Sequence, residues 1–231
     1  MVDALEVLRG ISPELSSESL PFIREAMANN FGLERVDLSA GGRVDVLSKI
    51  APGEDDAPDV DLLMLRSPSA VGPLPLIYFV HGGGMVTGNR TSGVEVLLPY
   101  VRDGLAVVAS VEYRLAPEHQ YPAPLDDCYA GLVWLFRNAA ELAIDPARIV
   151  LVGVSAGGGL AAGCALMARD RGVPILSHQI LMSPMLDDRL ETHSSRMLDR
   201  EGFWDRHDNL FGWTTLLGER RGGADVPGYA G

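Results

Sequence analysis

The chain has 231 residues, of which 47% are hydrophobic, and a formal net charge of −12 at pH 7. This length and hydrophobic content predict a single soluble globular domain and exclude a disordered chain. No apolar run is long enough to span a bilayer. The Lys and Arg residues form no basic stripe, so neither a membrane nor a nucleic acid is expected as a partner.

The N-terminus and the two cysteines indicate the compartment. Asp3 and Glu6 stand where a secretory signal would carry basic residues, and no apolar segment follows them, so we expect a cytoplasmic protein. Cys128 and Cys164 lie in helical patterns and lack the spacing of a metal site. Buried, reduced thiols are therefore expected, with no metal and no other cofactor.

The hydrophobic pattern predicts an N-terminal helical arm followed by alternating strands and helices. In residues 12–30, Leu20, Ile23 and Met27 recur at helical spacing behind Ser and Glu capping residues. Strands are predicted at 44–49, 59–66, 74–80, 105–113, 148–154 and 175–183, and helices at 92–104, 124–143, 156–172 and 201–219. The alternation predicts an α/β fold with a mostly parallel sheet and helices on both faces.

The segment Gly153-Val154-Ser155-Ala156-Gly157 fits the pattern G-x-S-x-G. A predicted strand precedes it and a predicted helix follows it, which is the context of a nucleophilic serine on a sharp turn. The flanking glycines allow the strand and the helix to approach closely, and the helix N-terminus presents free N–H groups beside the serine. A phosphate-binding glycine loop is the alternative interpretation, and the lysine of a Walker-type loop is absent.

A second motif, His81-Gly82-Gly83-Gly84, directly follows the apolar strand at 74–80. Consecutive glycines at the end of a strand can turn backbone N–H groups toward a cleft, where they stabilise a developing oxyanion. His81 adjoins this turn, and we expect it to shape the loop by hydrogen bonding rather than to act as a base.

The loop 111–127 follows the next strand and contains three prolines. We expect Arg114 and Glu118 to pair as a brace within it and His119 to be structural, so that the loop serves as scaffold beside the site.

Four segments together resemble the hormone-sensitive-lipase-like (GDXG) esterases of the α/β-hydrolase superfamily: "HGGG", "YRLAPEHQYPAPLDD", "GVSAGGGLA" and "LMSPMLDDR". The resemblance implies an α/β-hydrolase fold with a helical cap and hydrolysis of small carboxylic esters. It implies that Ser155 is the nucleophile and that Gly83, Gly84 and Ala156 donate the oxyanion-hole N–H groups. His81, Gly82, Gly153 and Gly157 would then be structural members of the motifs.

Two residues depart from the family pattern. Val154 stands where the family usually has aspartate, which removes a polar anchor beneath the serine. Met85 stands where an aromatic residue usually follows "HGGG", which is expected to reshape the acyl or alcohol pocket. The resemblance divides the single domain 1–231 into an N-terminal cap arm (1–42), a core (43–185), and a cap insertion with the chain end (186–231).

A general base for Ser155 is not evident. In this superfamily the acid and the histidine follow the serine in the chain, and only His178, His193 and His207 do so here. His178 lies at the far end of its strand, His193 matches no catalytic position, and His207 is expected to pack on the apolar face of the last helix. Asp187 and Asp188 are at the correct sheet edge but belong to a structural motif of the family.

Three hypotheses follow. The first is a serine carboxylesterase whose C-terminal part, with the acid and histidine and the last strands, is absent from these residues, so that this stretch alone is nearly inactive. The second is a ligand-binding protein on an esterase scaffold that does not hydrolyse its ligand. The third is a homodimer that completes the fold in trans, because the strand at 175–183 would otherwise be an exposed apolar edge.

Overall fold

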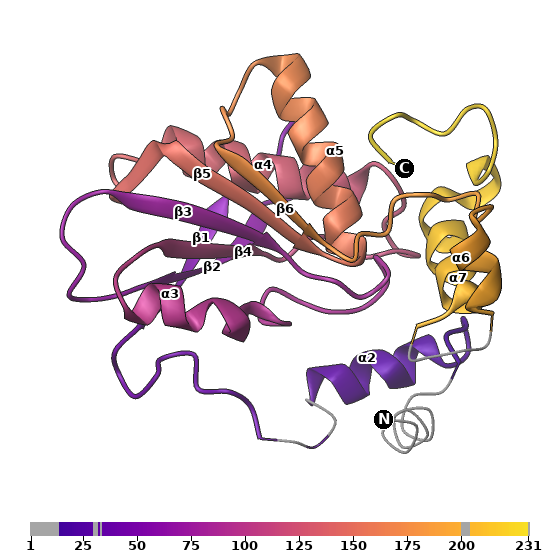
Figure 1. Cartoon of the computed structure of the whole chain (residues 1–231), viewed down its shortest axis with the longest axis horizontal. Coiled ribbons are helices and arrows are strands. Elements are labelled where there is room, and N and C mark those ends of the chain that lie inside the picture. The colour runs from indigo at the N-terminus through magenta and orange to yellow at the C-terminus, as the bar shows by residue number, and fades with distance from the viewer. Residues whose placement is uncertain (1–13, 30–31, 33, 200–203, 231) are drawn as a thin grey trace.

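The computed structural model describes residues 14–29, 32, 34–199 and 204–230. A six-stranded sheet runs through its centre in the order β1-β2-β4-β3-β5-β6 (Figure 1). Strand β2 pairs antiparallel with β1 on one side and with β4 on the other, whereas β4, β3, β5 and β6 run parallel to one another. This confirms the predicted mostly parallel sheet. The strands are β1 (Asp45–Ala51), β2 (Val60–Arg66), β3 (Leu74–Val80), β4 (Val107–Val111), β5 (Ile144–Val154) and β6 (His178–Met182).

Helices cover both faces of the sheet, as the alternating pattern predicts. Helices α4 (Ala123–Arg137) and α5 (Ala156–Arg171) lie on one face, and α3 (Leu98–Arg102) with the 3-10 turn η2 (Val94–Leu97) lies on the other (Figure 1). Two apolar clusters fill the spaces between these layers. All five residues of β4 are buried, which explains why its sequence is a continuous apolar run.

The remaining helices lie together beyond the carboxyl ends of the parallel strands (Figure 1). They are α2 (Leu20–Ala28), α6 (His193–Met197), α7 (Arg206–Leu217) and the 3-10 turn η3 (Gly218–Arg220). Ile23 of α2 and Trp213 of α7 are both buried in the larger cluster, so residues far apart in the chain share one core. Asp205 caps α7 by accepting hydrogen bonds from the N–H groups of His207 and Asp208.

Several element boundaries differ from the prediction. Strand β6 begins at His178 rather than near residue 175, because its pairing with β5 starts where His178 lies opposite Val150. Strand β5 begins earlier than predicted, at Ile144, which lies opposite Leu74 of β3. The last helix starts at Arg206, behind its Asp205 cap, and the predicted helical residues 201–203 lie outside the described residues.

Strand β6 forms one edge of the sheet, as expected for the segment 175–183. Ile180 and Met182 are 49% and 47% exposed, and Ile175 just before the strand is 73% exposed. Among the described residues, no element pairs with the outer side of this strand. The backbone groups on that side are therefore available for pairing with another strand.

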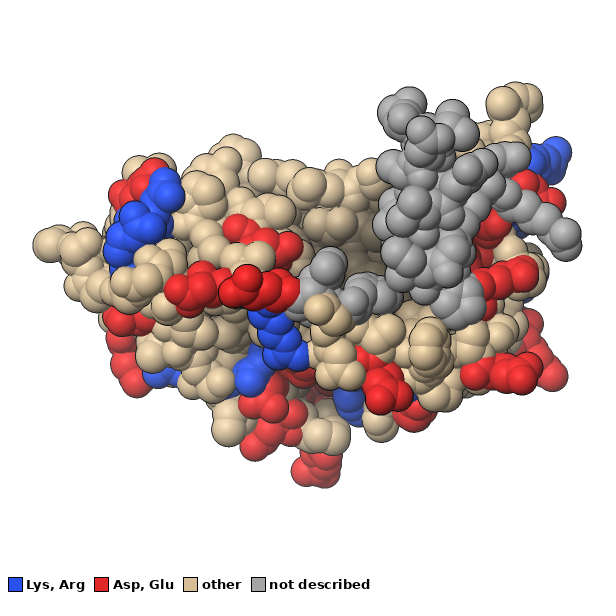
Figure 2. Space-filling model, turned by 90° about the horizontal axis from the view of Figure 1, so that it is seen from below, with Lys and Arg blue, Asp and Glu red and all other residues tan. Residues whose placement is uncertain are grey.

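The surface charge reflects the acidic composition of the chain, and the two cysteines have the predicted state. Figure 2 shows acidic side chains spread over one face, with Lys and Arg scattered among them and no continuous basic area. Cys128 and Cys164 are both buried and free, as predicted. In the part of the chain that the structure describes, no helix combines the length and the hydropathy that crossing a membrane requires.

Candidate active site

Ser155 lies at the turn between β5 and α5 in a strained backbone conformation. Its φ is +54° and its ψ is −121°, in the half of torsion space that L-residues with a side chain rarely occupy. The Ser155 N–H donates to Met182 O at 2.9 Å, and the Ser155 carbonyl accepts from the N–H groups of Met185 and Gly158, each at 2.9 Å. These bonds fix the backbone, whereas the partly exposed side chain makes no hydrogen bond with a described residue.

Glycines at the turn permit contacts that any side chain would block. A Cβ on Gly153 would lie 2.2 Å from Gly157 O, and a Cβ on Gly157 would lie 2.2 Å from the carbonyl oxygens of Val80 and His81. Helix α5 therefore begins in direct backbone contact with the end of β3. This contact places Ser155 beside the segment that follows β3.

That segment, residues 82–88, is called the glycine loop below. Gly83 and Gly84 have φ of +116° and +62°, and Gly83 O accepts hydrogen bonds from the N–H groups of Val86 and Thr87 at 3.1 and 2.9 Å. A Cβ on Gly82 would lie 3.3 Å from Ser155 Cβ, so the loop passes within van der Waals distance of the serine.

The N–H groups around Ser155 are not used internally. Among the described residues, no acceptor bonds the N–H of Gly83, of Gly84 or of Ala156, the first residue of α5. Helix N-termini leave such donors free and carry a partial positive charge. The arrangement therefore brings two loop glycines and a helix N-terminus close to one serine, and it can bind a negatively charged oxygen there.

His81 is fully buried and stacks on Tyr113, with ring centroids 4.1 Å apart. Its Nδ1 lies 2.7 Å from Gly82 O, and since a carbonyl only accepts, Nδ1 carries the proton. Nε2 is buried without a hydrogen-bond partner among the described residues. Burial lowers the pKa of His81 to about 4, because a second N–H would have no acceptor. His81 is thus neutral at pH 7, and its Nδ1–H group fixes the Gly82–Gly83 peptide by donating to its carbonyl oxygen.

The buried imidazole makes stability depend on pH. We expect the free energy of unfolding to fall by about 3 kcal/mol between pH 6.5, the ordinary pKa of histidine, and pH 4, the approximate pKa of His81 in the folded chain. Above this window the imidazole is neutral in both states. Within it the unfolded chain takes up a proton that the folded chain excludes. Urea unfolding at pH 7 and pH 5 measures the loss, expected at about 2 kcal/mol over that interval.

A matched pair of variants isolates this contribution. His81→Gln is expected to reduce the pH dependence of the unfolding free energy, whereas His193→Gln, at an exposed position, is expected to leave it unchanged. An unaltered pH dependence in His81→Gln would contradict the assignment.

Helix α7 and the residue before its cap lie over the glycine loop. A Cβ on Gly84 would lie 2.3 Å from the indole ring of Trp204, and a Cβ on Gly212 would lie 2.9 Å from Gly84 O. The indole N–H of Trp204 donates to Asn209 Oδ1 at 2.7 Å, which orients the ring. Sequence reasoning missed Trp204 and Gly212. The only signal was a glycine inside an otherwise amphipathic helix, which indicates a close approach of another backbone.

The predicted pairing of Arg114 with Glu118 is wrong. Arg114 instead binds Asp127 of α4 through both carboxylate oxygens, with the closest contact at 2.7 Å, and Asp127 is 3% exposed. Asp127 also accepts from the Arg114 backbone N–H at 2.8 Å. Glu118 instead pairs with Arg24 of α2, at 2.8 Å.

None of the five histidines bonds to Ser155. His178 pairs with Val150 in the sheet, four residues before Val154. His193 and His119 are exposed. His207 is also exposed and lies 3.1 Å from Glu14, so its expected place on the apolar face of α7 is wrong. The helix turns Trp213, Leu216 and Leu217 inward, which leaves His207 in its first turn facing solvent.

The two departures from the family pattern lie in apolar surroundings. Val154 is partly buried against the smaller apolar cluster. Met85 is fully buried, and its Cε lies 3.5 Å from the position that a Cβ on Gly159 would take. The LDD segment contributes a buried Asp188, which binds the backbone N–H of Gly222.

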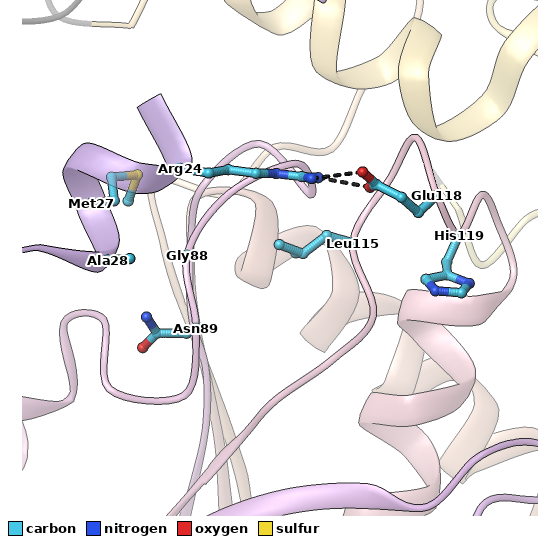
Figure 3. Close-up of a pocket in the computed structure, with 8 residues that line it drawn as sticks. All are labelled: Arg24, Met27, Ala28, Gly88, Asn89, Leu115, Glu118 and His119. Atoms are coloured by element: carbon cyan, nitrogen blue, oxygen red, sulfur yellow. Dashed lines mark hydrogen bonds and ion pairs between the residues drawn. The ribbon is translucent and has the colours of Figure 1, made fainter. Parts of the chain in front are cut away.

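A pocket of about 350 Å³ lies between helix α2 and the loops that follow β3 and β4 (Figure 3). Ser155 is not among its lining residues. The described residues contain no cluster of three or more side chains suited to a metal ion. The residues lining the pocket are Arg24, Met27, Ala28, Gly88, Asn89, Leu115, Glu118 and His119.

The chain is similar to known proteins over much of its length. Carboxylesterase NlhH of Mycobacterium tuberculosis is 41% identical over 155 residues, 64% of this chain and 49% of that protein. Gibberellin receptor GID1 of Oryza sativa subsp. japonica is 33% identical over 196 residues, 80% of this chain and 54% of that protein. The chain thus spans about half the length of the curated relatives it matches.

The structural neighbours include esterases. A bacterial heroin esterase superimposes with a TM-score of 0.89 at 38% identity, over 98% of this chain and 72% of that one. The family model described as alpha/beta hydrolase fold matches residues 77–228, which include both glycine motifs. The resemblance stated from these motifs is confirmed, and the chain belongs to the alpha/beta hydrolase fold family.

Proposed function

We propose that the intact protein is a serine carboxylesterase that hydrolyses small, largely apolar carboxylic esters through an acyl-enzyme on Ser155. One observation carries this proposal: the glycine loop passes within van der Waals distance of Ser155 Cβ while the N–H groups of Gly83, Gly84 and Ala156 make no bond with a described residue. A strained serine beside several free donors is the arrangement that acyl transfer needs.

The reaction follows from this placement. Ser155 Oγ attacks the ester carbonyl carbon, and the carbonyl oxygen becomes an oxyanion that accepts hydrogen bonds from the three N–H groups. Each such donor contributes on the order of 3 kcal/mol to the transition state. A general base takes the Ser155 Oγ proton and gives it to the departing alcohol. Water then attacks the acyl-enzyme, gives its proton to the same base, and the acid leaves as that proton returns to Ser155 Oγ. His81, Gly82, Gly153 and Gly157 act by holding the two loops in contact.

The general base is assigned outside these residues. Neutral His81 has its only ring N–H proton on Nδ1, donated to Gly82 O, and the other four histidines make no hydrogen bond with Ser155. We assign the base and its acid to sequence beyond the 231 residues, since the curated relatives are about twice as long as the matched part. Removal of a triad histidine lowers kcat on the order of a millionfold, so this stretch alone is expected to be nearly inactive.

The substrate class rests on the surroundings of the glycine loop. The indole ring of Trp204 lies against Gly84, and Met185 Cε lies 3.2 Å from the position of a Cβ on Gly212. Together they place apolar side chains close to the carbonyl-binding donors. Short acyl groups fit such a surface, whereas charged groups would lose hydration without gaining a partner.

A covalent probe tests the proposal. The tryptic peptide Ile149–Arg169 contains Ser155 as its only serine. We expect the intact protein to hydrolyse p-nitrophenyl acetate and butyrate, and a fluorophosphonate to stop this hydrolysis in step with the appearance of one adduct on that peptide. Hydrolysis that persists after complete labelling, or no hydrolysis of any nitrophenyl ester, would overturn the proposal.

Ligand binding without hydrolysis is a second candidate. It is favoured by the similarity to a gibberellin receptor and by the lack of a histidine hydrogen-bonded to Ser155 among the described residues. Calorimetry with the amide analogue of a hydrolysed ester distinguishes the two. Binding without turnover of the ester supports a receptor, and the absence of binding removes this candidate.

A further inference from the structure

Arg24 of helix α2 hydrogen-bonds the glycine loop and the loop after β4. Its guanidinium donates from Nε to Val86 O at 2.7 Å and from Nη2 to Ala116 O at 2.8 Å. Nη1 and Nη2 also donate to the two carboxylate oxygens of Glu118 at 2.8 and 2.9 Å. Figure 3 shows the Arg24 side chain extending from α2 across the pocket toward Glu118.

The two carbonyl groups that Arg24 binds belong to loops that also contact each other. The Ala116 N–H donates to Met85 O at 2.9 Å, which joins the loop after β4 to the glycine loop. Val86 in turn donates its N–H to Gly83 O at 3.1 Å. Arg24 therefore binds both sides of this contact, two residues along the chain from Gly84.

Val86 and Ala116 are both fully buried. Among the described residues, Arg24 is the only donor to either of their carbonyl oxygens. A buried carbonyl without a hydrogen-bond donor is costly in free energy. Both loops are therefore most stable in the positions where Arg24 donates to these two carbonyl oxygens. The planar guanidinium presents its donors in a fixed geometry, which a flexible ammonium would not reproduce.

The ion pair between Arg24 and Glu118 contributes less to stability than the bonds to the two carbonyls. The hydrogen bonds from Arg24 lower the pKa of Glu118 to about 2, so the carboxylate stays ionised at working pH. Its side chain is 55% exposed, however, and exposed ion pairs contribute little to stability. The two bonds to buried carbonyls distinguish Arg24 from an ordinary surface arginine.

We propose that Arg24 is a positioning residue for the oxyanion hole, through which the docking of helix α2 fixes the glycine loop in its active geometry. This inference rests on the proposed esterase function. It makes the N-terminal arm part of the catalytic arrangement, because Gly83 and Gly84 keep their N–H groups aimed at the oxyanion only while Val86 is held. The loss of Arg24 then weakens transition-state binding more than substrate binding.

The test compares Arg24→Met with Glu118→Gln in the intact protein. Arg24→Met keeps an apolar stem but removes every donor, and we expect kcat for p-nitrophenyl butyrate to fall 10- to 100-fold with KM within about twofold. Glu118→Gln leaves the carbonyl bonds in place, and we expect kcat within about threefold. If Arg24→Met does not fold, Arg24→Lys, whose single ammonium nitrogen can reach one of the two carbonyls, is expected to show a smaller loss of kcat with KM again unchanged.

Hydrogen exchange gives a readout that does not depend on turnover. We expect amides of residues 82–88 to exchange at least tenfold faster in Arg24→Met than in wild type, while exchange in β4 is unchanged. Unchanged kcat and exchange in that variant would overturn the inference. If the wild-type protein hydrolyses no ester, the proposed function fails. Faster exchange of residues 82–88 in Arg24→Met would then still show that Arg24 fixes the glycine loop.

Discussion

Replacing Ser155 with alanine is expected to lower kcat of the intact protein on the order of a millionfold for p-nitrophenyl butyrate. The substitution removes the hydroxyl that we propose attacks the carbonyl carbon, beside the N–H groups of the glycine loop that bond no described residue. What remains is the oxyanion hole, which alone retains weak catalysis over water. Steady-state kinetics on the purified variant measure the effect.

The same variant is expected to fold normally. The Ser155 side chain bonds no described residue, and alanine adopts the +54° φ at a cost similar to that of serine. Urea unfolding should therefore shift by about 0.5 kcal/mol or less. Ser183→Ala is the matched control, because Ser183 is exposed, has φ of +46° and follows Met182, which binds the Ser155 N–H. Similar losses of kcat in both variants would show that Ser155 acts structurally.

Local sequence signals predicted the sheet and the two glycine motifs. Continuous apolar runs such as residues 74–80 are stable between two layers of helices, so a mostly parallel sheet with helices on both faces followed from the alternation. The glycines of each motif indicated tight turns, and the two turns meet because the carboxyl ends of neighbouring parallel strands lie at the same edge. These features depend on short-range pattern and general packing rules.

The contacts that shape the site from outside the sheet were not predictable. Arg24 binds carbonyls 62 and 92 residues away, and Trp204 lies against Gly84 across 120 positions of sequence. The hydrophobic periodicity of a sequence gives no signal of contacts between such distant residues. The expected Arg114–Glu118 brace failed for the same reason, since a nearby partner in sequence lost to Asp127, which α4 buries beside Arg114. Tertiary placement of charges decides which ion pairs form.

Gly157→Ala is expected to destabilise the chain by on the order of 4 kcal/mol. The new Cβ would lie 2.2 Å from Val80 O and His81 O, and both atoms belong to backbone that cannot rotate away. His81 O also accepts from Tyr113 Oη at 2.9 Å, and the Tyr113 ring stacks on His81. Any shift that relieves the clash therefore disturbs the buried end of β3.

The same shift would separate the two halves of the site. Ser155 moves with α5, whereas Gly83 and Gly84 move with β3, so a displacement between them lengthens the hydrogen bonds that the oxyanion requires. We expect the folded fraction of Gly157→Ala to lose at least a hundredfold in kcat, comparable to removal of one oxyanion donor. Urea unfolding and kinetics check both effects.

Gly228→Ala serves as the control, because no heavy atom lies within 4 Å of its added Cβ. It should change unfolding by about 0.5 kcal/mol or less. If Gly157→Ala were equally mild, contact between α5 and the end of β3 would not hold the glycine loop against Ser155. In that case the position of the loop would depend on Arg24 and on the Thr87–Gly83 hydrogen bonds alone. The double variant Gly157→Ala/Arg24→Met would then lose no more kcat than Arg24→Met does by itself.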